Sequence, residues 1–271
     1  METVKIENPN VASQPKHRKG ISAALVIVVC LIVAHLFFYY VCGNPSNFDA
    51  KGHPIDNNIF GTLYQGGFVI PIVITLLLTV LALGVERIVA LHKASGKGKV
   101  ADFVIQAKEL LRKGDLKATE ELCDRQQGSV ANILKSALVR YRDVENRNDL
   151  TSDEKASIVE KEVADATALE LPYMQQNLNV IATISSLGTL FGLLGTVLGM
   201  IRSFGAMANE GAPDSIALSL GISEALMNTA MGITTGALAI IVYNYFSSRV
   251  ENITNAVDEV GFAIGQTFKE R

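Results

Sequence analysis

Four long apolar stretches alternate with polar segments along the chain. They occupy residues 20–42, 66–91, 179–205 and 215–246. As helices rising about 1.5 Å per residue, all four are long enough to cross about 30 Å of hydrocarbon. Nearly all of the 24 basic and 27 acidic residues lie outside them, which is the segregation that a bilayer imposes on a sequence. The pattern predicts an all-α polytopic membrane protein with four transmembrane helices.

The first stretch, residues 20–42, follows a basic cluster and could be mistaken for a signal peptide. It is longer than a secretory apolar region, and it ends in the aromatic group 37–40 instead of small residues before a cleavage site. We therefore expect a retained transmembrane helix. His35 inside it is expected to be a packed or interface histidine and not a proton carrier.

Basic residues predict the orientation of the four helices. The two short loops hold a single basic residue, Lys51, whereas the amino terminus and the long polar segment hold many. Because basic loops stay in the cytoplasm, both termini are expected there. The predicted order is a cytoplasmic tail at 1–19, a periplasmic loop at 43–65, a cytoplasmic domain at 92–178, a periplasmic loop at 206–214 and a cytoplasmic tail at 247–271.

The cytoplasmic domain at 92–178 has a helical pattern. Its first apolar stripe repeats every three or four residues: Val100, Phe103, Val104, Ala107, Leu110 and Leu111. Gly114 indicates a helix end followed by a restart, and the spacing of Thr151 and Glu154 predicts a capping box that begins another helix. That helix is expected to run toward the third span, with a kink or boundary near Pro172.

Small residues line one side of each of the last two spans. They are Gly188, Gly192, Gly195 and Gly199 in the third span, and Gly221, Ala225, Gly232 and Gly236 in the fourth. Lipid gives apolar helices no hydrophobic reason to associate, so close backbone approach through small residues is a main source of contact energy. The two stripes predict that these helices pack tightly together, which is sufficient to explain them.

Polar residues form a second stripe in the same two spans. They are Ser185, Thr189, Thr196 and Ser203 in the third span, and Glu224, Asn228 and Thr235 in the fourth. A hydroxyl can bond back to a carbonyl one turn earlier, so a threonine inside a membrane is often structural. An ionised carboxyl group cannot satisfy itself in this way, because it has no proton to donate to a carbonyl oxygen. Glu224 is therefore the principal candidate for chemistry.

Burial of Glu224 in the membrane costs free energy, which suggests that the residue has a function. An ionised carboxylate in hydrocarbon costs on the order of 3 kcal/mol, so such a group faces a bundle interior or a watery cavity. Glu224 could be protonated when closed off and ionised when hydrated, which makes it a proton switch. The alternative is a permanently neutral glutamate that holds neighbouring helices together, although a glutamine would do that without the risk of ionisation.

The loop between the last two spans suggests a shared site. Thr196 and Glu224 are each fourteen residues from Glu210, near the centre of that loop. In antiparallel helices these two side chains are expected at similar depth, facing one another or one lumen.

Other kinds of function find little support in the sequence. A net charge of −3 gives no basic surface for nucleic acid. Three scattered cysteines and four scattered histidines predict neither a disulfide framework nor a metal site. Familiar catalytic motifs do not occur, so we expect no enzyme and no cofactor. A secondary transporter is disfavoured because paired inverted halves are not apparent.

The sequence resembles the MotA/TolQ/ExbB proton-channel family, most closely its ExbB branch. The resemblance rests on LGTLFGLLGTVLGMIRSF at 187–204 and GISEALMNTAMGITTGALAIIVYN at 221–244, and more weakly on LALGVERIVAL at 81–91. It covers roughly two thirds of the chain. The first span is an addition to the simplest three-span members, and is expected to be a peripheral helix. Leu238 stands near a position where the family often has a proline, which removes any argument from a kink there.

The resemblance implies a ring of identical subunits, a pentamer, in the bacterial inner membrane. The ring would enclose single-span ExbD-like helices that carry a membrane aspartate. Proton flow would drive a TonB-like protein and active uptake across the outer membrane. Carried over by motif, the pore residues are Thr196, Glu224 and Thr229. Helical geometry puts Thr229 beside the small-residue face, so its pore role comes from the resemblance.

Two groups of alternatives remain open. A TolQ-like or MotA-like subunit would share the motor and differ in its partner, although MotA normally has a larger cytoplasmic region. A non-conducting membrane scaffold would use Glu224 only to join helices. We expect proton flux to separate the scaffold from the motors.

Overall fold

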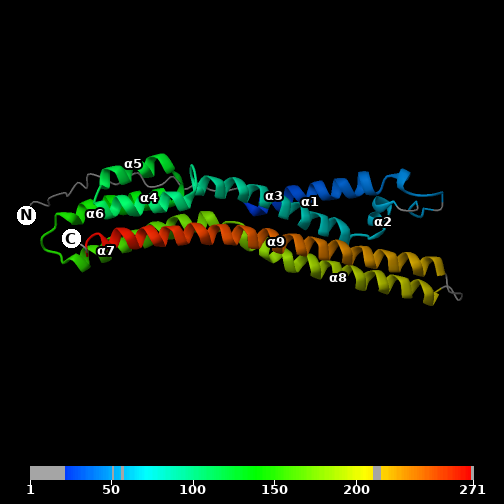
Figure 1. Ribbon diagram of the computed structural model, residues 1–271. Helices are drawn as coiled ribbons and strands as arrows, with labels where there is room; N and C mark the ends of the chain where they lie inside the picture. Colours follow the sequence, from blue (N-terminus) through cyan, green and yellow to red (C-terminus); the bar gives the residue numbers. More distant parts are fainter. Residues whose placement is uncertain (1–21, 51, 56–57, 210–214, 270–271) are drawn as a thin grey trace, which may run out of the picture.

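The protein is an elongated bundle of helices. The computed structural model describes residues 22–50, 52–55, 58–209 and 215–269. Long helices form one end of the molecule, and shorter helices cluster around the second half of α9 at the other end (Figure 1). The helices are α1 (Ala23–Phe37), α2 (Ile59–Gln65), α3 (Val69–Ser95), α4 (Val100–Lys113), α5 (Leu116–Gln126), α6 (Gly128–Glu145), α7 (Ser152–Gln175), α8 (Leu178–Asn209) and α9 (Ser215–Gln266), with short η1 (Phe38–Cys42) and η2 (Pro45–Asn47).

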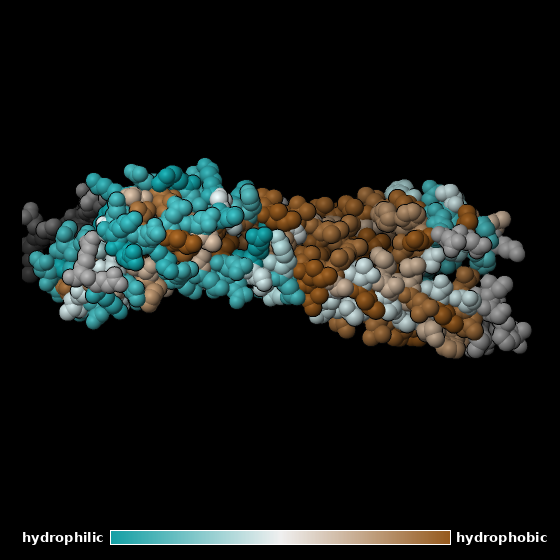
Figure 2. Space-filling model, in the orientation of Figure 1, coloured by the Kyte–Doolittle hydropathy of each residue, from teal (hydrophilic) through white to brown (hydrophobic). Residues whose placement is uncertain are grey.

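Four helical segments are long and apolar enough to cross a membrane. They are Ala23–Cys42, Val69–Lys113, Ser152–Gly205 and Leu218–Gln266. On the face shown in Figure 2, an apolar surface lies between a large hydrophilic end of the molecule and a smaller hydrophilic area at the opposite end. The prediction of an all-α polytopic membrane protein with four transmembrane helices is confirmed.

The first span packs along α3. Ala34, Phe38 and Cys42 are buried together with Ile70 and Ile74 in a small apolar cluster. The outward side of α1 is exposed and apolar, as expected for a helix at the edge of a bundle in lipid. The added first span is therefore peripheral in the single chain.

Two asparagines organise the loop between α1 and α2. The side-chain amide of Asn47 donates to the carbonyl oxygens of Val41, at 2.7 Å, and Cys42, at 3.0 Å. Asn58 donates to the Oδ1 atom of Asn47 at 3.0 Å, and its own side-chain oxygen caps the first amides of α2. These bonds satisfy backbone groups that a helix end leaves unpaired. They also fix where α2 begins, directly after Asn58.

The helix boundaries that the sequence predicts at Gly114 and Thr151, in the polar segment 92–178, are confirmed. Gly114 takes the left-handed conformation, with φ of 72°, after α4. Asp115 begins α5 by accepting a hydrogen bond from the Ala118 amide at 2.9 Å. Thr151 and Glu154 form the reciprocal capping box at the start of α7. Each signal is local, because a cap depends on residues within one turn.

The last helix is longer than the sequence analysis expected. Residues 247–271 were predicted to be a tail, but α9 continues through them to Gln266 and packs against α4, α6 and α7. The buried positions in this part are Val250, Ile253, Val257, Val260 and Ile264. They recur every three to four residues, so an apolar stripe holds this half of α9 in the core of the cytoplasmic domain.

The helical path of the chain is interrupted between α7 and α8, where the polar helical domain meets the apolar helices. Helix α7 passes through Pro172 and ends at Gln175, and Asn177, with φ of 64°, turns the chain into α8. The guanidinium of Arg87 on α3 donates to the carbonyl oxygens of Tyr173, at 3.0 Å, and Met174, at 3.2 Å. The proline thus lies close to the boundary, as predicted, and a buried arginine caps the helix end.

Candidate functional site

Glycines set the contact between α8 and α9. A Cβ atom built at Gly192 would lie 2.9 Å from the Cα atom of Gly232, and one at Gly188 would lie 3.1 Å from the amide nitrogen of Gly236. Side chains larger than hydrogen would push the two backbones apart. The predicted tight packing through the two small-residue stripes is therefore observed.

The same contacts fix the register of the two helices. Because Gly188 lies opposite Gly236 and Gly192 opposite Gly232, the helix pair is centred near residue 212 and not near Glu210. Glu224 then lies opposite residue 200, which is four residues, or about 6 Å along the helix, from Thr196. The expectation that Thr196 and Glu224 share one depth is off by about one helical turn.

Thr196 lies instead beside Thr229. Their hydroxyl oxygens contact one another across the helix pair, and the Thr196 hydroxyl also lies 3.3 Å from the carbonyl oxygen of Ala225. Both side chains are half-buried. The structure thus joins two of the residues that the family resemblance selected, on the small-residue side of α9.

Glu224 is paired with an arginine. Its Oε1 atom lies 2.8 Å from an Nη atom of Arg202 on α8, without the alignment of a hydrogen bond. The glutamate side chain is 12% exposed, whereas that of Arg202 is 51% exposed. Gly67, in the turn before α3, lies against both charged groups. The candidate acid is therefore nearly enclosed within one chain, next to its counter-ion.

The polar stripe of α9 continues below Glu224. The Asn228 amide donates to the Gly66 carbonyl oxygen at 3.1 Å, and both Asn228 and Thr235 are fully buried. Three buried side-chain oxygens in the described residues have no hydrogen-bond partner, and they belong to Glu224, Asn228 and Thr235. Their spacing puts them on one face of α9. A row of unsatisfied polar atoms in an apolar bundle is where water or a moving proton would find partners.

Thr189 does not join this row. Its side chain is exposed, and its hydroxyl donates to the carbonyl oxygen of Ser185 at 3.4 Å, one turn earlier on α8. It lies close to Gly236, on the packing side of α9. Among the described residues, no hydrogen bond joins Thr189 to Glu224 or to Asn228.

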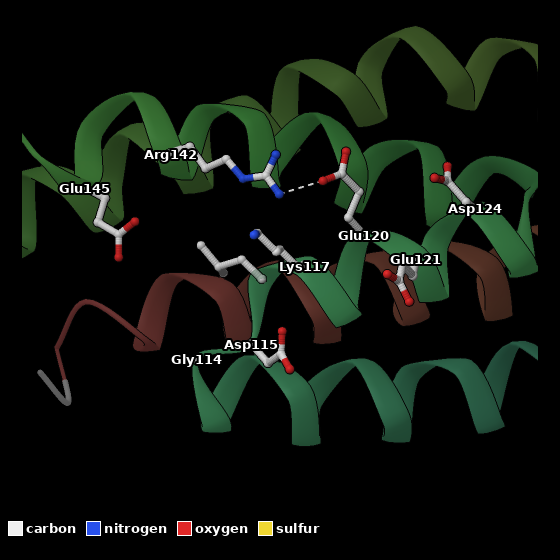
Figure 3. Close-up of a pocket in the computed structure, with 9 residues that line it drawn as sticks. Gly114, Asp115, Lys117, Glu120, Glu121, Asp124, Arg142 and Glu145 are labelled. Carbon is white, nitrogen blue, oxygen red and sulfur yellow. Dashed lines mark hydrogen bonds and ion pairs between the residues drawn. The ribbon is translucent and has the colours of Figure 1, made fainter.

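A surface hollow of about 750 Å³ lies elsewhere, between α5 and α6 in the cytoplasmic part (Figure 3). Its acidic lining residues are Asp115, Glu120, Glu121, Asp124 and Glu145. Arg142 neutralises part of this charge through an ion pair with Glu120 at 2.5 Å. The described residues contain no group of three or more His, Cys, Asp or Glu that could hold a metal ion. The hollow is therefore separate from the membrane residues and shows no catalytic arrangement.

The sequence analysis missed Arg202 and the turn at Gly66 and Gly67. The signal for Arg202 was present, because it is the only charged residue of α8, as Glu224 is the only one in the first half of α9. Two isolated opposite charges in neighbouring spans favour pairing. The glycine turn gave no comparable signal, since its contact with α9 joins segments about 160 residues apart.

Comparisons with known proteins match the region that contains these residues. Residues 126–259 match the model of the MotA/TolQ/ExbB proton channel family. The biopolymer transport protein ExbB of Salmonella typhimurium is 25% identical over 169 residues, covering 60% of this chain and 69% of that protein. The Tol-Pal system protein TolQ of Pseudomonas aeruginosa is 29% identical over 122 residues, covering 45% of this chain and 53% of that protein.

An ExbB-like protein of Synechocystis is 38% identical over 85 residues, or 31% of this chain and 40% of that protein. The alignments with these three relatives thus span between 40% and 69% of their length. Thr196, Arg202, Glu224 and Thr229 all lie inside the matched region. The family match and the relatives named ExbB and TolQ support an ExbB-like member of the MotA/TolQ/ExbB proton channel family.

Proposed function

We propose that this chain is the ExbB-type subunit of a proton-driven motor. With an ExbD-like single-span partner that carries a membrane aspartate, it would convert the proton motive force into work on a TonB-like protein. That work would drive active transport across the outer membrane. The proposed place is the bacterial inner membrane, with both termini in the cytoplasm.

One observation carries the proposal. Glu224 is the only carboxyl group in the first half of α9, and its buried Oε1 atom has no hydrogen-bond partner in the described structure. A glutamate kept only to join helices would be expected to use its oxygens in bonds. An acid whose one charged contact, with Arg202, lacks the alignment of a hydrogen bond, and which Asn228 and Thr235 follow on the same face, is suited to exchanging a proton.

Apolar side chains on the outside of the α8–α9 pair support assembly into a ring. Leu193, Val197 and Ile201 on α8 and Leu226 and Ile233 on α9 are each about half exposed or more in the single chain. In a membrane they would contact lipid or further copies of the chain. A pentamer around the partner's helices would place Thr196, Thr229 and Thr189 near a central lumen, which no single chain encloses.

Proton flux tests the proposal. Vesicles that contain the chain and its ExbD-like partner should take up protons under a gradient, and Glu224→Gln should abolish this uptake while the protein still folds. The matched control is Glu251→Gln, which makes the same chemical change at an exposed position of the same helix. Flux through Glu224→Gln equal to that of the wild type would contradict the proposal and favour a scaffold.

A TolQ-like role is the second candidate, because the identity to the Pseudomonas aeruginosa TolQ is comparable with that to the Salmonella ExbB. The two roles share Glu224 and differ in the partner. Purification of the chain from its own membranes, with identification of the single-span protein that accompanies it, would separate them. A TonB-like protein in the same complex would favour the ExbB-type role.

A further inference from the structure

The two spans that carry the polar residues contain one charge each, and these charges are in contact. Arg202 is the only charged residue of α8, and Glu224 is the only one of α9 before Arg249. The nearest atoms, Nη2 of Arg202 and Oε1 of Glu224, are 2.8 Å apart. A single charge in hydrocarbon costs free energy, and contact between two opposite charges lowers that cost for both.

No other charged side chain approaches Glu224 from the elements packed around it in the described structure. Helix α2 has no charged residue, and neither does α3 before Glu86. The one titratable side chain of α2, Tyr64, stacks on Phe38 instead. One turn along α9 lies Asn228, which is neutral. Among the described charged side chains, Arg202 is therefore the one that favours the ionised form of Glu224 in this conformation.

An arginine in contact with an acid favours the ionised form of that acid. A guanidinium group does not give up its proton in proteins, so Arg202 remains a cation whatever Glu224 does. While the two are in contact, the carboxylate is favoured as an anion, because only the anion attracts the arginine. Withdrawal of the guanidinium therefore favours a proton on Glu224.

The contact is built so that it can open. It joins Arg202 to Oε1 of Glu224 without hydrogen-bond alignment, so it lacks the rigid two-pronged geometry of the strongest arginine–carboxylate pairs. The arginine side chain is 51% exposed, which leaves it room to swing away. Gly67 also leaves space, since a Cβ atom there would lie 3.3 Å from Nη2 of Arg202 and 3.4 Å from Oε1 of Glu224.

We propose that Arg202 is the counter-ion that holds Glu224 ionised in the resting chain, and that its displacement admits the proton. Arg202 is then a positioning residue that decides when the acid is available. Its meaning for a motor rests on the proposed function, but the ion pair itself can be tested without transport.

Labelling with dicyclohexylcarbodiimide tests the pair directly. Carbodiimides add to protonated carboxyl groups in apolar surroundings and spare carboxylates. In membranes that contain the full chain, labelling of position 224 would be measured by peptide mass spectrometry. Wild type should label slowly and Arg202→Gln about tenfold faster, the change expected when one opposite charge in contact is removed. Arg202→Lys, which keeps the charge, should stay near the wild-type rate.

Two matched variants control the experiment. Glu224→Gln gives the background, and Arg249→Gln removes an arginine of α9 that lies over Tyr245 and does not contact Glu224. Arg249→Gln should label like the wild type. Gly67→Ala keeps Arg202 but crowds the contact, so it should also raise labelling. This second route decides the question if Arg202→Gln does not fold.

Equal labelling of position 224 in the wild type, Arg202→Gln and Gly67→Ala would overturn the inference. Proton flux measured in the same vesicles distinguishes this failure from that of the proposed function. If the wild type conducts protons but the variants label like the wild type, only the proposed role of Arg202 is wrong. If labelling follows the expected pattern but the wild type shows no proton flux, the inference about the ion pair stands and the proposed motor function is wrong.

Discussion

At the scale of single residues, the contact between Thr196 and Thr229 separates two interpretations of an intramembrane threonine. The hydroxyl of Thr196 can bond to its own helix, at Gly192, and it also reaches Thr229 and the Ala225 carbonyl on α9. A hydroxyl needed only for local satisfaction would use the first bond. The additional contacts indicate that this group links the two helices.

Thr196→Val tests that link, because valine keeps the shape and removes the hydroxyl. We expect a loss of about 0.6 kcal/mol in the free energy of unfolding, typical of one interhelical hydrogen bond in a membrane. Under the proposed function, proton flux per folded molecule should fall much more than this. Thr196→Ser, which retains the hydroxyl, should keep both quantities near the wild type. Unchanged flux in Thr196→Val would leave the threonine pair with a structural role alone.

At the scale of elements, the α8–α9 contact depends on where the glycines lie. Gly192 and Gly205 belong to the same helix, but a Cβ atom at Gly192 would lie 2.9 Å from the Cα atom of Gly232, whereas one at Gly205 would have nothing within 4 Å. Gly192→Ala should therefore destabilise the protein by about 1–3 kcal/mol, the usual cost of overpacking.

Gly205→Ala is the matched control for this prediction. It should be neutral or stabilising by up to about 1 kcal/mol, because alanine favours the helix more than glycine does. Unfolding by titration with a denaturing detergent, followed by circular dichroism, would measure both variants. Equal stabilities of the two variants would show that the close approach of α8 and α9 is not set by Gly192.

The same elements show what sequence alone could predict. The four spans, the caps at Gly114 and Thr151 and the two small-residue stripes were predictable because each depends on nearby residues or on helical period. The register of α8 on α9 was not, because the midpoint of a loop does not say which glycines meet. The second half of α9 was misjudged although Val250, Ile253 and Val257 repeat as a core stripe should.

The candidate site was predictable in part. Glu224, Asn228 and Thr235 were identified as one stripe, because their spacing alone places them on one face of a helix. Their neighbours were not, since Arg202 and the Gly66–Gly67 turn reach the stripe only through tertiary packing. Sequence periodicity describes a face of a helix, and the structure is needed to show what covers it.

At the scale of the whole molecule, Arg87 on the apolar helix α3 contacts the end of α7, in the polar helical domain. It is fully buried, forms an ion pair with Glu86 at 2.5 Å and caps the end of α7 through two carbonyl oxygens. Asn177, at the turn into α8, reaches the same glutamate at 3.4 Å. Under the proposed function, a movement of α8 that follows proton exchange at Glu224 would be passed to α7 through this junction.

Arg87→Met should loosen that junction. Removing one partner of a buried ion pair leaves Glu86 and two carbonyl oxygens unsatisfied, which typically costs about 3–5 kcal/mol. We expect faster amide hydrogen exchange at the end of α7 and faster proteolytic cleavage near residues 176–177. Arg140→Met, at a half-exposed pair with Asp143, should change neither. If Arg87→Met leaves exchange and cleavage at the wild-type rate, the apolar helices and the polar helical domain are held together mainly by α9, the helix that runs through both.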